Sequence, residues 1–115
     1  MSLYEYKARV TRVYDGDTIT VDIDLGFFVV LKNQTIRLFG LDAPEIRGEE
    51  RDAGLVSKRW LRSKVENQDI IIRTVKDAKG KYGRWIGTIL LTEGDEQINI
   101  NDEMIKTGMA TYVEY

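Results

Sequence analysis

Residues 18–25, TITVDIDL, alternate strictly between polar and apolar side chains, and this alternation constrains the fold more than any other feature. A period of two places Ile19 and Val21 on one face of a β-strand and Asp22 and Asp24 on the other. Another alternating segment comes before it, and the DGD sequence between the two is a turn signal. The pattern predicts an antiparallel hairpin with one face on a core and with Asp22 and Asp24 in solvent.

Further along the chain, patterning predicts three more strands and two helices. The third strand should bend near Asn33, and the last helix should be capped by Asn101 and end at Gly108. Three strands, a helix, two strands and a helix is the order of an OB-type barrel. We therefore expect a mainly β protein of the α+β class, a five-stranded OB-fold β-barrel with two packed helices, as one domain over residues 1–115. The expected strands are 3–14, 18–25, 27–40, 69–75 and 85–91, and the expected helices are 49–67 and 100–110.

The chain has no cysteine and no histidine, which limits its possible chemistry. Disulfides, thiolate nucleophiles and cysteine-based zinc sites are excluded, and so are the commonest general base and transition-metal ligand. Catalysis would have to use carboxylates, arginine, lysine, tyrosine or hydroxyls. Any bound metal would be a hard cation that prefers oxygen ligands, such as Ca²⁺ or Mg²⁺.

Charge is distributed unevenly along the sequence. The net charge is −2, a weak argument against nucleic-acid binding. Residues 47–84, however, carry eleven basic and six acidic side chains, a local charge of +5 between two acidic ends. Such a segment can form a positive surface despite the overall sign.

No apolar run is long enough to cross a bilayer, and the first ten residues contain no signal-peptide core. We expect no membrane partner. A secreted protein whose leader has been removed and a cytoplasmic protein both remain open, and a monomer is the default expectation.

Five charged residues form a possible catalytic set: Arg37 lies inside the third predicted strand, and the other four stand at the hairpin turn or in loops beside predicted strands. Two close carboxylates repel each other unless a cation lies between them, so Asp17 and Asp42 could supply the charged ligands of a cation. Arg37 and Arg84 suit a phosphate, because a guanidinium is planar, always charged and able to donate two bonds. Glu45 could hold or deprotonate a water. Together these roles amount to metal-assisted attack of water on a phosphodiester.

Each of these residues also has an ordinary structural explanation. Arg37 could form a cross-strand ion pair, Asp42 could be a turn residue, and Glu45 and Arg84 could be solvated loop charges. The spacing of acids after Asp15 does not fit an EF-hand. Only the combination favours a catalytic site.

Three motifs in order carry a family resemblance: YDGDTITV, IRLFGLDAPE and, after a predicted helix, KYGRWIGTI. In this combination the chain resembles the staphylococcal nuclease (thermonuclease) family from about Tyr4 to Ala110. The resemblance implies an OB-fold and a Ca²⁺-dependent phosphodiesterase that acts on DNA and RNA.

The resemblance also implies a role for particular residues. Asp17, Asp42 and the carbonyl of Ala43 would bind calcium, with Asp15 as a partner near the metal. Glu45 would be the general base or would position water, and Arg37 and Arg84 would stabilise charge on the reacting phosphate. Substrate would also contact two residues of the KYGR motif, Lys81 and Tyr82.

The chain departs from the family pattern in two places. Ala43 stands where the best-known members commonly have threonine, which removes a hydroxyl but keeps the carbonyl ligand. The family's third helix is absent from the sequence, and Tyr112 and Tyr115 align only loosely with tyrosines that stack on substrate.

Two other hypotheses belong to different classes. One is a non-catalytic domain of the same fold that binds nucleic acid or protein, although such domains typically lose the acids or arginines. The other is an unrelated OB-fold binder, which would expose aromatic residues on strand faces. Here the apolar sequence context predicts a core position for Phe27, Phe28, Trp60 and Trp85.

Overall fold

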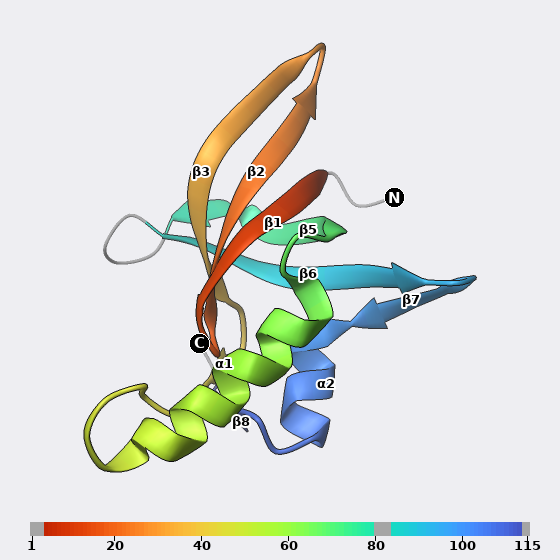
Figure 1. The fold of residues 1–115 in the computed structure, drawn as a ribbon. Coiled ribbons are helices and arrows are strands. Elements are labelled where there is room, and N and C mark those ends of the chain that lie inside the picture. The colour runs from red at the N-terminus through yellow and green to blue at the C-terminus, as the bar shows by residue number, and fades with distance from the viewer. Residues whose placement is uncertain (1–3, 80–83, 114–115) are drawn as a thin grey trace.

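A computed structural model describes residues 4–79 and 84–113, with the backbone alone for residues 75–79. Strands dominate, and two α-helices lie at the end of the molecule away from the long hairpin of β2 and β3 (Figure 1). The strands are β1 (Glu5–Asp15), β2 (Thr18–Gly26), β3 (Val29–Leu38), β4 (Leu41–Asp42), β5 (Asp69–Lys79), β6 (Trp85–Glu93), β7 (Glu96–Asn99) and β8 (Thr111–Tyr112); the helices are the 3₁₀ turn η1 (Gly48–Glu50), α1 (Arg51–Val65) and α2 (Ile100–Lys106).

Five strands close into a barrel. The sheet order is β3-β2-β1-β5-β6-β7, and β3 also pairs in parallel with β6 over residues 36–38. That pairing joins the two ends of the five-strand run and closes the barrel, as a five-stranded OB-type fold requires. The predicted fold class is confirmed.

The core follows the alternation seen in the sequence. Residues of β1 and β2 that share one face, among them Val10, Ile19 and Val21, are buried, while Asp24 on the opposite face is exposed. Helix α1 buries Leu61 and Val65 in the same cluster, with Trp60 packed half-buried beside them. Trp85 is also half-buried and packs against this cluster, so both tryptophans lie at the border of the predicted core rather than inside it.

The cap of α2 is Asn99, and the prediction of Asn101 was wrong. The Asn99 side chain accepts a hydrogen bond from the Asp102 amide at 3.1 Å. Asn101 lies buried in the first turn, where its Oδ1 accepts from the Ile89 amide at 3.0 Å. Its Nδ2 donates to the carbonyls of Phe39 and Gly87. Asn101 therefore fixes α2 to the closed end of the barrel.

The β2–β3 hairpin confirms one prediction and contradicts another. The expected bend near Asn33 is present: Asn33 has φ +55°, and the pairing with β2 shifts by one residue there. Phe27 and Phe28, however, form the two-residue turn and are fully exposed. The apolar run is real, but the hairpin is longer than the barrel and carries its tip beyond the core (Figure 1).

Four short or extended elements were not predicted. Strand β5 continues to Lys79, into the expected loop 76–84, and β7 occupies part of the expected turn 92–97. Strands β4 and β8 form a separate two-stranded sheet in which Asp42 pairs with Thr111. Neither α-helix in the described part of the chain is long and apolar enough to span a membrane.

Candidate active site

The turn between β1 and β2 has two central residues, Gly16 and Asp17. Gly16 has to be a glycine, because its neighbours leave no room for a side chain. A Cβ on Gly16 would lie 2.7 Å from the Cβ of Ala43 and 2.9 Å from that of Ser57. The missing side chain lets the turn approach both the loop after β4 and helix α1.

Asp17 is held by several groups and is only 13% exposed. Its Oδ2 accepts the Ala43 amide at 3.1 Å, and its Oδ1 accepts the Thr18 hydroxyl at 3.0 Å. Its own amide donates to Asp15 Oδ1 at 3.1 Å. The carboxylate is therefore fixed between the turn and the loop that follows β4.

Arg37 joins the two aspartates that the sequence analysis proposed as cation ligands. Its Nη1 lies 2.9 Å from Asp17 Oδ2, and its Nη2 lies 2.9 Å from Asp42 Oδ1. The arginine is 18% exposed and Asp42 is 60% exposed. One guanidinium thus uses two donors on two different carboxylates, and it joins the end of β3 to the β1–β2 turn and to β4.

Strand β4, which ends at Asp42, and the loop after it, which carries Glu45, are supported from two sides. On one side the Thr111 hydroxyl donates to the Asp42 carbonyl at 3.3 Å, within the β4–β8 pair. On the other side Gly54 of α1 lies so close that a Cβ there would fall 2.1 Å from the Glu45 carbonyl oxygen. The Glu45 amide also donates to the Glu50 carboxylate at 2.9 Å.

The two turn aspartates have opposite pKa shifts. Burial, followed by the hydrogen bond and charge of Asp17, raises the pKa of Asp15 to about 6. Burial also pushes the pKa of Asp17 upward, but hydrogen bonds from Asp15 and Ala43 and the charge of Arg37 outweigh it and leave this pKa below its usual value. The pair therefore retains a proton on Asp15 and a charge on Asp17 in mildly acidic solution.

Four acidic residues, together with Arg37 and Arg84, line one small polar pocket of about 230 Å³. The pocket brings together every predicted catalytic residue and every predicted metal ligand. Lys81, Tyr82 and Tyr115 lie outside the described residues, and Tyr112 stands exposed on β8. The residues that line the pocket are Asp15, Asp17, Arg37, Asp42, Ala43, Pro44, Glu45 and Arg84.

The oxygen-bearing side chains of this pocket are of the kind that binds a hard cation. Four acidic residues, Asp15, Asp17, Asp42 and Glu45, line the same pocket, and Ca²⁺ prefers oxygen ligands such as carboxylates. Their present arrangement is set by Arg37, which contacts two of the four. Among the described residues, no three acidic side chains lie close enough together to form a metal cluster.

Three supporting residues were not identified from the sequence. Gly16 and Gly54 allow the close approaches that position Asp17 and Glu45. Ser57 of α1 donates to the Met109 carbonyl at 2.5 Å and ties the helix to the segment before β8. A glycine within a predicted helix was the one available signal, since Gly54 weakens a helix unless packing requires it.

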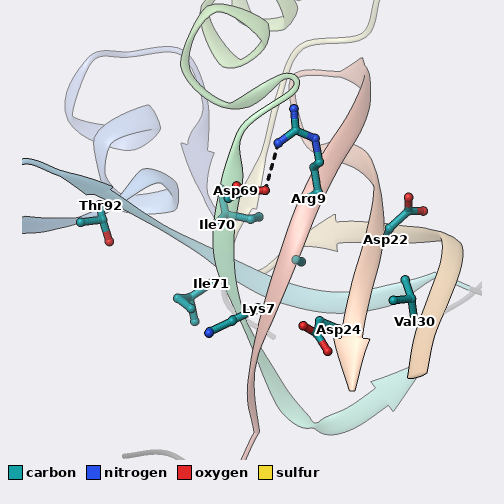
Figure 2. A pocket seen from close by; sticks show the side chains of 10 residues that line it. Lys7, Arg9, Asp22, Asp24, Val30, Asp69, Ile70, Ile71 and Thr92 are labelled. Carbon is teal, nitrogen blue, oxygen red and sulfur yellow. Dashed lines mark hydrogen bonds and ion pairs between the residues drawn. The ribbon is translucent and has the colours of Figure 1, made fainter. Parts of the chain in front are cut away.

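A separate hollow of about 620 Å³ opens on the barrel wall, away from the acidic pocket. Figure 2 shows Lys7 and Asp24 lining it, with Arg9 and Asp69 joined by an ion pair of 3.0 Å. Its lining includes none of the predicted site residues.

Comparison with known proteins finds a family and relatives whose names refer to nucleases. Residues 35–115 match the family described as staphylococcal nuclease homologue. A thermonuclease of Staphylococcus intermedius is 31% identical over 88% of this chain, and an uncharacterized endonuclease of Escherichia coli O157:H7 is 32% identical over 93%. An uncharacterized protein of Methanocaldococcus jannaschii is 28% identical over 91%.

The chain spans 56%, 61% and 58% of the lengths of these three relatives, in that order. The matched region begins near the end of β3 and includes the loop after β4, so it contains the acidic pocket except for the turn at Asp17. More than half of the sequence is covered. The chain belongs to the family of staphylococcal nuclease homologues.

Proposed function

We propose that the protein is a calcium-dependent nuclease that hydrolyses phosphodiester bonds of DNA and RNA. One observation carries the proposal: Arg37 bridges Asp17 and Asp42 in a pocket that Glu45 and Arg84 also line. Carboxylates for a cation, arginines for a phosphate and a further acid for water are the parts that metal-assisted hydrolysis of a phosphodiester needs.

In this proposal Asp17, Asp42 and the Ala43 carbonyl would hold Ca²⁺, and the bound ion would supply positive charge to the substrate phosphate. Arg37 and Arg84 donate to the phosphate oxygens, where charge develops in the transition state. Glu45 orients the attacking water and accepts its proton. Lys81 and Tyr82 bind the neighbouring phosphate.

The fixed position of Asp17 supports its role. A carboxylate held by a backbone amide, a hydroxyl and a guanidinium keeps its place while ligands exchange. Asp42 is more exposed and has one described ion-pair partner, so it can turn toward a cation at little cost.

Cleavage of single-stranded DNA, measured with Ca²⁺ and with EDTA, tests the proposal. We expect cleavage in Ca²⁺ only, and we expect Glu45→Gln to lower kcat by roughly 10²–10⁴-fold, the usual contribution of a general base. Glu49→Gln is the matched control, because Glu49 lies nearby in η1 but does not line the pocket. It should retain full activity.

Calorimetry with Ca²⁺ separates binding from chemistry. Asp42→Asn should weaken binding of Ca²⁺, while Glu45→Gln should bind it with little change. If folded wild-type protein binds DNA but does not cleave it in Ca²⁺, the alternative of a non-catalytic nucleic-acid-binding domain replaces this proposal.

A further inference from the structure

The tip of the β2–β3 hairpin, residues Leu25 to Leu31, is an exposed apolar surface. Phe27 and Phe28 are fully exposed, and four aliphatic neighbours are about half exposed. Figure 1 shows the hairpin extending beyond the other strands, so the tip is a projection rather than part of the barrel wall. The four aliphatic residues are Leu25, Val29, Val30 and Leu31.

The turn at this tip has an unfavourable sequence for its backbone. Gly26 pairs with Val29, and the two residues between them, Phe27 and Phe28, have φ values of +53° and +62°. Two-residue hairpin turns of this kind favour Asn-Gly, because most other side chains rarely adopt positive φ. The hairpin therefore displays two aromatic rings in solvent on a strained turn, and the barrel gains no packing from them.

The exposed area is large for a monomer. Two free phenylalanine side chains present about 400 Å², and four half-exposed aliphatic residues, divided between the two faces of the hairpin, add roughly 200 Å². This total reaches the upper end of the largest apolar patches on monomers, about 300–600 Å². It also approaches the share of about 800 Å² that one partner contributes to a standard interface.

Strand β3 adds a free edge beside the tip. Its pairing with β6 covers residues 36–38 only, and among the described residues the part before Ile36 has β2 on one side and no strand on the other. An apolar edge strand is a template for pairing with another strand. A second β3 in antiparallel orientation would extend the sheet across the two copies.

An apolar pocket extends from the tip down the same hairpin, from Leu25 and Leu31 to Trp85. It measures about 220 Å³, enough for a phenyl ring, and it opens on the face that continues the core side of β2 and β3. Trp85 pairs with Ile36, so antiparallel pairing of two β3 edges centred near Lys32 brings the tip of each hairpin beside the Trp85 end of the pocket in the other copy. The pocket is lined by Tyr6, Ile23, Leu25, Leu31, Thr74 and Trp85.

We propose that the hairpin tip binds a second copy of this chain, through antiparallel β3 edges, with the phenylalanines of each tip in the pocket of the other copy. The contact is isologous and closes as a two-fold dimer. Charges of both signs border the tip of every copy, because Asp24 precedes it and Lys32 follows it, and Lys32 lies 3.4 Å from Asp22 of the same hairpin. An acidic or basic partner would not match this mixture.

Sedimentation velocity from micromolar to millimolar protein tests the proposal. The wild type should form dimers as concentration rises. The double variant Phe27→Asn/Phe28→Gly removes both rings and supplies the preferred turn sequence, so it should fold at least as well and stay monomeric. We expect dimer affinity to fall by roughly a hundred-fold or more, as for loss of interface hot spots. Val56→Asn, at an exposed apolar site on α1, is the control and should still dimerise.

Hydrogen exchange locates the contact, since amides at residues 29–32 should exchange more slowly at high concentration. A wild type that stays monomeric overturns the proposal, as does a double variant that dimerises like the wild type. Flotation of a monomeric wild type with phosphatidylcholine vesicles would instead identify a lipid surface as the occupant. None of these measurements uses nuclease activity, so this proposal and the proposed function succeed or fail separately.

Discussion

Replacing Gly54 by alanine should destabilise the protein, although alanine is the better helix former. Gly54 is buried in the first turns of α1, against the loop that carries Glu45. A Cβ there would lie 2.1 Å from the Glu45 carbonyl oxygen, 2.5 Å from its carbonyl carbon and 2.9 Å from the Ile46 amide nitrogen. All three atoms belong to the backbone, so no side-chain rotation can relieve the contact.

The size of the effect follows from two opposing terms. Helix propensity favours alanine over glycine by about 1 kcal/mol in a helix interior. Overpacking usually costs about 1–3 kcal/mol. The cost here should lie at or above the upper end of that range, because the added Cβ meets only backbone atoms. The net expectation is a loss of about 2 kcal/mol of unfolding free energy, with α1 moved away from the Glu45 loop.

Urea unfolding at fixed pH measures this difference directly. The control is Ala53→Gly, one residue earlier on the exposed side of α1, which should lose only the propensity term of about 1 kcal/mol. If Gly54→Ala were as stable as the wild type or more stable, the result would contradict the close contact between α1 and the Glu45 loop on which this prediction rests.

Three further predictions concern the site and its support. Because the pKa of Asp15 is about 6 in the folded state against an ordinary value of 3.8, protonated Asp15 stabilises the fold fully below pH 4, and this contribution is lost as the pH rises through 6. In EDTA, urea unfolding should therefore show Asp15→Asn to be more stable than the wild type at pH 8 by about 1 kcal/mol, allowing for partial exposure, with no such gain at pH 4. Asn101→Ala removes three buried hydrogen bonds, including the one that the Ile89 amide donates, so the unfolding free energy should fall by about 3 kcal/mol in a thermal or urea titration. Arg37→Lys keeps the charge but cannot reach two carboxylates in a fixed geometry, so kcat on single-stranded DNA should fall by roughly a hundred-fold while the fold persists, and unchanged kcat would contradict the role of Arg37.

The sequence predicted the barrel because its strands alternate cleanly. The period-two alternation predicted that Ile19 and Val21 are buried, and the structure buries both. The turn signals between strands limit the possible connections. The same argument was wrong for Phe27 and Phe28. An apolar run indicates what a strand prefers to contact, but it does not tell how far the hairpin extends past the barrel that would cover it.

The chemistry of the site was readable in residue types, whereas its geometry was not. Spacing along the chain could not show that Arg37 contacts both Asp17 and Asp42, because that contact depends on how β3 and β4 meet in space. The cap of α2 was ambiguous for a local reason. Asn99 and Asn101 stand two residues apart, and only the barrel surface decides which of them turns inward.

The pairing of β4 with β8 has a consequence for the order in which the protein forms during synthesis. Leu41 and Asp42 pair with Tyr112 and Thr111, about seventy positions later in the chain. During synthesis the strands of the barrel leave the ribosome before β8 does, so we expect Leu41 and Asp42 to gain this pairing only after the first four strands of the barrel have emerged.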